Sequence, residues 1–192
     1  MEKLAELKEA GIYKEWWAPG AVVALMGFAI TTMATGLHHA GFWGGAATLA
    51  LILSFGGTAQ FVGGVIELRK GHLFGGSAFC SYGTFWWGIF ILLFILPTAG
   101  VPVGPMDKLG FLLVWTLFTF SFLWASYKHG RFLFILFLLA FIAFILLDIN
   151  CCFPALEPIA GWETFIAGLW AWYIAGATLV NTEFKRTILP LK

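Results

Sequence analysis

The chain has 192 residues, of which 60% are hydrophobic, 18% are aromatic and only 11% are charged. This composition excludes an ordinary soluble domain and fits one small polytopic membrane domain. The formal net charge is +1, and the basic residues are spread over short segments rather than gathered in a patch, which argues against a nucleic-acid partner.

Six long, charge-poor apolar runs follow one another along the chain, each near the roughly 20 residues that a helix needs to cross hydrocarbon. We expect helices at residues 18–37, 42–66, 73–96, 109–127, 132–147 and 159–180, the fifth being slightly short. The predicted fold class is an all-α integral membrane protein with six transmembrane helices. Residues 18–180 form the transmembrane domain in this interpretation, and residues 181–192 form a tail.

Basic residues mark one side of the predicted bundle. Ten of the eleven Lys and Arg residues precede the first run or follow the second, fourth and sixth runs, and only Lys108 falls on the other side. Because cationic loops near membrane ends resist translocation, we expect both termini to be cytoplasmic. Residues 1–17 have no apolar core, which predicts a cytoplasmic segment that is either an amphipathic surface helix or a solvated tail.

Polar residues within the apolar runs are candidates for lining a solute path. On the first run, the residues that share or flank one helix face are Phe28, Thr31, Thr32, Thr35, His38 and His39. Their hydroxyls could instead bond to the preceding turn of their own helix. Gln60 has no comparable local partner, and an unsatisfied amide in hydrocarbon is costly, so it either ties two helices together or lines water. On the third run, Ser81 lies beside Tyr82 in a second polar stripe.

The charged residues point to weak binding rather than tight capture. No Lys or Arg falls in the middle of any run, whereas a tight anion binder would be expected to place one there. A conduit must release its solute, and hydroxyl, amide and imidazole groups suit small anions or neutral polar solutes in fast passage. Glu67 lies near a predicted span end, where we expect an ion pair with Arg69, Lys70 or Arg131.

Patterns typical of enzymes and cofactor sites are missing from the sequence. There is no HExxH, no cysteine pair with zinc spacing, no phosphate loop and no pair of histidines at matching depth for haem. We therefore expect no enzyme activity, no cofactor and no metal. Cys80, Cys151 and Cys152 are interpreted as packing residues.

Several strings of residues carry a resemblance to a known family. They are Leu25, Met26, Gly27, Phe28, Thr31, Thr32, Leu37, His38 and Gly41; Gly56, Gly57, Ala59, Gln60, Gly64, Glu67, Lys70 and Gly71; and Phe74, Gly75, Ala78, Phe79, Ser81, Tyr82, Gly83, Phe85 and Trp86. With these strings the chain closely resembles the acetate uptake transporter family over nearly its whole length. The likeness is weakest in the fourth and fifth runs.

The resemblance implies a homo-hexamer in which each six-helix subunit has its own acetate path, narrowed by a Phe, a Tyr and a Leu. By motif register the first two are Phe28 and Tyr82. The third is Leu139 when counted back from Asn150, and the count forward from Arg131 gives Ala140. The family's opening motif, Asn-Pro-Ala-Pro-Leu-Gly, is replaced by residues 19–24, which leaves the substrate preference open.

We therefore predict a transporter or channel for acetate and similar short carboxylates, extending to succinate, in the cytoplasmic membrane. The expected polar lining consists of Thr31, Thr32, Thr35, His38, Gln60, Ser81 and Asn150, with Ala171 as a small residue facing the path. Expected partners are the small carboxylate, membrane lipid and further copies of the chain. The alternatives are a conduit for ammonium, formate or urea, and a non-conducting acid sensor.

Overall fold

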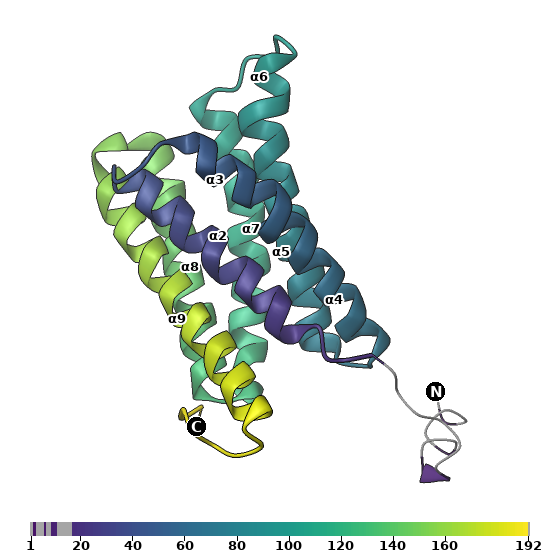
Figure 1. The fold of residues 1–192 in the computed structure, drawn as a ribbon. Coiled ribbons are helices and arrows are strands. Elements are labelled where there is room, and N and C mark those ends of the chain that lie inside the picture. Colours follow the sequence, from purple (N-terminus) through teal and green to yellow (C-terminus); the bar gives the residue numbers. More distant parts are fainter. Residues whose placement is uncertain (1, 3–5, 7–8, 11–16, 192) are drawn as a thin grey trace.

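The computed structural model describes residues 2, 6, 9, 10 and 17–191. The helix considered for the amphipathic segment at residues 1–17 falls largely outside this described part. Between residues 17 and 191 all regular structure is helical, and six helical stretches are long and apolar enough to cross a membrane. The predicted fold class is thereby confirmed (Figure 1).

The six spans follow the chain in order. They are α2 (Ala21–His39); α3 (Gly45–Leu51), η1 (Ile52–Ala59) and α4 (Gln60–Arg69), which continue one another; α5 (Leu73–Phe90) with η2 (Ile91–Ile95) and α6 (Leu96–Thr98); α7 (Pro105–Ser126) with η3 (Tyr127–His129); α8 (Arg131–Cys152); and, after η4 (Pro154–Leu156), α9 (Glu157–Glu183). The stretches η1 and η2 are π-helical turns within the second and third spans.

The fifth span is longer than the sequence indicated. We expected it to end at residue 147, just before Asp148, but α8 continues to Cys152. Asp148 is buried, and its carboxylate accepts a 2.6 Å hydrogen bond from the Thr116 hydroxyl of α7. A carboxylate inside a membrane span is costly, and this hydrogen bond across the helix interface offsets part of that cost. The fourth span likewise begins earlier, at Pro105, where the Asp107 carboxylate caps the amide of Gly104 at 2.7 Å.

The helices α2 and α9 pack closely along their length (Figure 1). At Gly36 an added side-chain carbon would lie 2.4 Å from the backbone nitrogen of Phe165, and at Gly168 it would lie 2.6 Å from that of Met33. Both glycines are therefore required for this approach, as small residues are between membrane helices generally.

Aromatic rings fill the contact between α5 and α7 instead. The ring centroids of Phe85 and Phe111 are 5.8 Å apart, and those of Tyr82 and Phe118 are 5.4 Å apart. Large rings hold these two helices farther apart than the glycines hold α2 and α9. Side chains from all six spans line the interior of the bundle.

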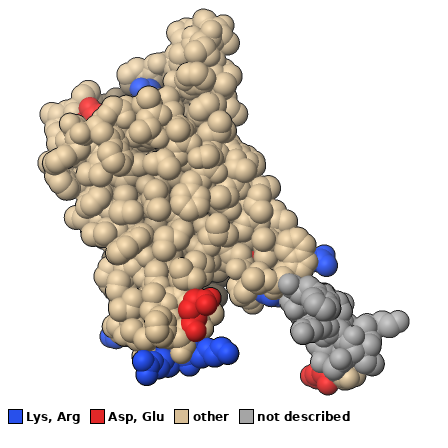
Figure 2. Space-filling model, viewed as in Figure 1, with Lys and Arg blue, Asp and Glu red and all other residues tan. Residues whose placement is uncertain are grey.

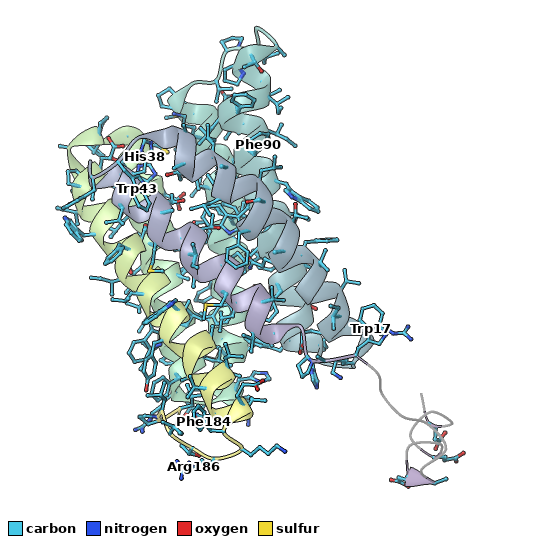
Figure 3. All side chains as sticks on the ribbon, viewed as in Figure 1. Trp17, His38, Trp43, Phe90, Phe184 and Arg186 are labelled. Carbon is cyan, nitrogen blue, oxygen red and sulfur yellow. The ribbon has the colours of Figure 1, made fainter. Side chains whose placement is uncertain are left out.

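Basic side chains gather at one end of the bundle. Lys70, Lys128, Arg131 and Lys185 follow or begin helices there, while Lys108 lies near the start of α7 at the opposite end (Figure 2). We call these the basic end and the far end. Figure 3 shows Phe184 and Arg186 at the basic end, opposite His38 and Trp43.

The segment after α9 folds back against the basic end. The side-chain oxygen of Asn181 accepts hydrogen bonds from the amides of Ile188 at 2.7 Å and Leu189 at 2.9 Å, and its NH2 group donates to the Leu189 carbonyl at 2.7 Å. The Tyr173 hydroxyl donates to the Pro190 carbonyl at 2.9 Å. These bonds bring Leu191 against the core of the bundle.

Candidate substrate path

Two cavities enter the bundle from opposite ends. The basic-end cavity has a volume of about 710 Å³ and reaches the α4–α5 turn at Gly71 and His72. The far-end cavity has a volume of about 530 Å³ and reaches Pro105, Lys108 and Glu157. Together they extend from one end of the bundle toward the other.

The cavities meet at Phe28 and Ala140, which line both of them. Phe28 packs against Tyr82 with ring centroids 5.6 Å apart, and both side chains are buried. The junction between the two cavities is therefore bordered by Phe28 of α2, Tyr82 of α5 and Ala140 of α8. Two of these are the aromatic residues that the family resemblance placed at the constriction.

Ala140, rather than Leu139, occupies the third position at this junction. Leu139 is partly exposed and lines neither cavity. The cavity-facing residues of α8 include Leu136, Ala140 and Phe144, which recur at helical spacing, and Leu139 lies on the adjacent face. The forward count from Arg131 is the one that matches this geometry.

The Tyr82 hydroxyl is already bonded inside the protein. It lies 2.8 Å from the Thr119 hydroxyl of α7, and both side chains are buried. Phe118 packs edge-on against the Tyr82 ring at 5.4 Å. Tyr82 therefore contributes a fixed ring to the wall, and its hydroxyl is engaged by Thr119.

Gln60 lies at the inner part of the basic-end cavity and is fully buried. Its Cβ is 3.3 Å from the position that a side-chain carbon at Gly27 would take, so it lies close in depth to Phe28. Neither its amide oxygen nor its amide nitrogen has a hydrogen-bond partner among the described residues. Of the two interpretations of Gln60, this geometry favours contact with water or a solute over a tie between helices.

Four of the other expected lining residues face the far-end cavity, namely Thr32, Thr35, His38 and Asn150. The Thr32 hydroxyl and the Asn150 side-chain oxygen are buried and have no partner in the described part of the chain. Nδ1 of His38 is 3.1 Å from the Trp43 carbonyl at the mouth of the bundle (Figure 3).

Three expected residues lie outside both cavities, namely Thr31, Ser81 and Ala171. The Thr31 hydroxyl donates to the Leu51 carbonyl at 3.3 Å, where the two helices pack. Ala171 is fully buried in the core cluster. Thr31 and Ala171 therefore serve helix packing in this structure.

Trp86 and Thr164 line the far-end cavity although sequence reasoning did not select them. Both are 4% exposed, and neither the Trp86 indole nitrogen nor the Thr164 hydroxyl has a partner among the residues described. Trp86 follows Tyr82 by one helical turn, and that spacing is a signal that could have identified it. Thr164 gave no such signal, because the residue that we selected on its span was the small, apolar Ala171.

The charged residues at the basic end form a different contact from the one expected. The Glu67 carboxylate is buried, accepts a bond from the Ala21 amide at 3.1 Å and lies 2.6 Å from Nδ1 of His72. The Lys70 amine donates to the Trp17 carbonyl at 2.9 Å. No group of three or more His, Cys, Asp or Glu side chains within the described residues is arranged to hold a metal ion.

Comparison with known proteins identifies the family. Residues 7–191 match the model of the GPR1/FUN34/yaaH family. The chain belongs to this family. The family resemblance read from the sequence is thereby confirmed.

Family members of known name and structure cover most of the chain. The succinate-acetate/proton symporter SatP of Escherichia coli (strain K12) is 35% identical over 176 residues, which cover 89% of this chain and 93% of that protein. The ammonia transport outward protein 2 of Saccharomyces cerevisiae is 34% identical over 154 residues, 74% of this chain and 53% of that protein. The solved structure of the bacterial acetate channel SatP has a TM-score of 0.87 and 32% identity, covering 92% of this chain and 99% of that one.

Proposed function

We propose that this protein passes acetate and similar short carboxylates, including succinate, across the cell membrane. The observation that carries the proposal is the pair of cavities that enter from opposite ends and meet at Phe28 and Ala140. A passage for a small solute requires spaces within the bundle that reach both ends and are separated only by a few side chains, and these two cavities share Phe28 and Ala140 as lining residues. The names of the similar proteins, an acetate channel and a succinate-acetate/proton symporter, support acetate as the solute.

The chemistry of the junction fits a small carboxylate. Acetate needs hydrogen-bond donors for its oxygens and apolar surface for its methyl group. The Gln60 amide lies on the basic-end side of Phe28 and the Thr32 hydroxyl on the far-end side, while the Phe28 ring provides apolar surface between them. Among the described residues that line the junction there is no Lys or Arg, so the anion is held weakly enough to leave.

Flux measurements on the purified protein in liposomes test this function. We expect uptake of labelled acetate, and the same vesicles are assayed with labelled succinate, formate, urea and methylammonium. Transport of methylammonium without acetate would favour the ammonium alternative, for which the name of the yeast relative is the supporting observation. An acetate-dependent rise in melting temperature without any flux would identify a sensor instead.

Acetate flux measured with and without a pH gradient distinguishes a channel from a proton-coupled transporter. A channel responds to the acetate gradient and the membrane potential, whereas symport makes an imposed proton gradient drive acetate against its own gradient. The names of the similar proteins include both a channel and a proton symporter, so this comparison decides between two specific mechanisms.

We also propose that the basic end faces the cytoplasm. The support is the gathering of Lys and Arg there, which follows the positive-inside rule. In a cysteine-free background, an impermeant thiol reagent applied to intact cells should label Val101→Cys and leave Lys128→Cys unlabelled. Both positions are exposed, so accessibility from the two sides is the variable that the experiment compares. The reverse labelling would invert the orientation.

The assembly that the family resemblance implies is a homo-hexamer, and we propose it for this chain. Large apolar side chains such as Leu117 and Trp124 on α7 are 69% and 81% exposed in the single subunit, which leaves surface for lipid and for neighbouring subunits. Light scattering of the detergent-solubilised protein gives the subunit count. A monomer that conducts acetate would refute the hexamer while leaving the path within the subunit intact.

A further inference from the structure

The far-end cavity contains three buried hydrogen-bond donors from three different helices. They are the Thr32 hydroxyl of α2, the Trp86 indole N–H of α5 and the Thr164 hydroxyl of α9. Each side chain is at most 5% exposed, and none of these polar atoms has a partner among the described residues. An unsatisfied donor buried in a membrane protein costs free energy, which a bound solute or water would recover.

The helix register places Thr32 and Trp86 at the same depth. Phe28 and Tyr82 contact each other with ring centroids 5.6 Å apart, and α2 and α5 both run from the basic end to the far end. Thr32 and Trp86 each follow one of these two residues by four positions, one helical turn farther along the same face. They therefore lie one turn beyond the constriction on its far-end side.

Thr164 reaches the same cavity from α9, about one turn farther toward the far end than Thr32, because its neighbour Phe165 packs against Gly36 of α2. Gly168 packs against the backbone of Met33, and Thr164 precedes it by one turn on α9, which runs in the opposite direction. Thr164 therefore lies on the far-end side of the α2–α9 contact at Gly168, within the same cavity as Thr32 and Trp86.

The donor types restrict what can bind. An indole N–H only donates, and a threonine hydroxyl donates while it can also accept. A carboxylate has two oxygens that only accept, so it can take the indole and the hydroxyls together. Ammonium only donates and would leave the indole N–H unsatisfied.

From this placement we infer a carboxylate-binding site on the far-end side of the constriction, formed by Thr32 and Trp86 one turn beyond it and by Thr164 about one turn farther. The site rests on the proposed function, because it holds the solute before or after the constriction. The role of Trp86 is to donate its indole N–H to a carboxylate oxygen, and Thr164 supplies a second donor. The Phe28 ring faces the methyl end of the bound acid.

The test replaces Trp86 with Phe, which keeps an aromatic side chain and removes the N–H. In liposomes, Trp86→Phe should raise the acetate concentration that gives half-maximal flux by about tenfold, the expected effect of losing one hydrogen bond to a charged group. Flux of acetamide, which carries no charge, should change by much less. Thr164→Val gives a second variant with nearly the same side-chain shape, should Trp86→Phe fail to fold.

The neighbouring Trp87 provides the matched control. Its indole N–H donates to the Thr58 hydroxyl at 3.3 Å, and it lines neither cavity. Trp87→Phe therefore removes the same chemical group from the same helix without touching the inferred site, and the half-saturating acetate concentration should stay at the wild-type value. An equal change in both variants would overturn the inference, because the effect would then be structural.

A separate measurement distinguishes failure of the site from failure of the proposed function. Acetate should raise the melting temperature of the wild type and of Trp87→Phe in detergent, and should raise that of Trp86→Phe less. If the wild type conducts acetate but Trp86→Phe and Thr164→Val both keep its half-saturation and its melting shift, the site is refuted and the function stands. If acetate stabilises the wild type without flux, the function fails while the melting shifts still test the site.

Discussion

The two cavities differ in how far their polar side chains are already bonded within the protein. In the basic-end cavity, Glu67 is paired with His72, His129 stacks on Phe74 at 4.1 Å, and the Thr178 hydroxyl donates to its own helix. In the far-end cavity, the Thr32, Trp86, Thr164 and Asn150 side chains each present a buried polar atom without a partner in the described residues. Gln60 is the corresponding group at the inner part of the basic-end cavity.

This difference indicates where a carboxylate can exchange its water for protein. On the far-end side of Phe28 several helices offer free donors, whereas on the basic-end side Gln60 offers a single free amide and Glu67, His72 and Thr178 are bonded within the protein. A solute that passes the constriction toward the basic end therefore loses most of its hydrogen bonds to protein within one step. Conduction requires such weak holding on the exit side.

Closing the junction should abolish flux. Ala140→Phe places a ring where the two cavities meet, and we expect acetate uptake in liposomes to fall to the level of empty vesicles. Because overpacking also costs about 1–3 kcal/mol of stability, the melting temperature of the variant is measured on the same preparation. Leu139→Phe is the control, since Leu139 lines neither cavity, and it should conduct normally. If Leu139→Phe blocks acetate flux and Ala140→Phe conducts, then Leu139 and not Ala140 faces the path.

Opening the junction should change which acids pass. Phe28→Ala removes a ring that lines both cavities, so butyrate and other acids larger than acetate should gain flux relative to acetate. The side chains that set the minimum diameter of the path also set the size of the largest acid that can pass. Competition between labelled acetate and a series of longer acids measures this cutoff. An unchanged cutoff in a folded variant would place the path away from Phe28.

Removing the amide of Gln60 should reduce flux by a smaller factor. A typical hydrogen bond contributes about 0.5–1.5 kcal/mol, so Gln60→Leu should lower acetate flux by roughly twofold to tenfold. Because neither amide atom is bonded to protein in the described structure, we expect the melting temperature without acetate to fall little. Lost stability with normal flux per folded protein would show that Gln60 ties helices together after all.

The sequence predicted the parts of the molecule that depend on local pattern. Hydropathy located all six spans, and the family resemblance placed Phe28 and Tyr82 together, where the structure has their rings in contact. Gln60 was chosen because an unsatisfied amide is costly in hydrocarbon, Thr32 because it lies on a polar helix face, and Asn150 through the family resemblance. Each lines a cavity and has at least one polar atom without a bonded partner among the described residues.

The parts that depend on contacts between distant helices could not be predicted in the same way. Leu139 and Ala140 are adjacent, so their side chains point about 100° apart around the helix. The count back from Asn150 gave Leu139, and the count forward from Arg131 gave Ala140. We ended the fifth span before Asp148, and its hydrogen bond to Thr116 in another helix, which the sequence does not reveal, keeps it within the helix. Thr31 and Thr32 are adjacent in the same motif, yet Thr31 donates to Leu51 and Thr32 lines the cavity.

The smallest effect on flux is expected from the Tyr82 hydroxyl. Tyr82→Phe keeps the ring at the constriction and removes the 2.8 Å bond to Thr119, so acetate flux should stay near the wild-type value. The variant should nevertheless lose about 1 kcal/mol of stability, because the Thr119 hydroxyl is left buried without this partner. Thr119→Val should lower the melting temperature similarly, and the double variant should lose less than the sum of the two, since they remove one shared bond. A large loss of acetate flux in Tyr82→Phe alone would instead mean that the hydroxyl leaves Thr119 to bind the passing carboxylate, and the free donors would then lie on both sides of the constriction.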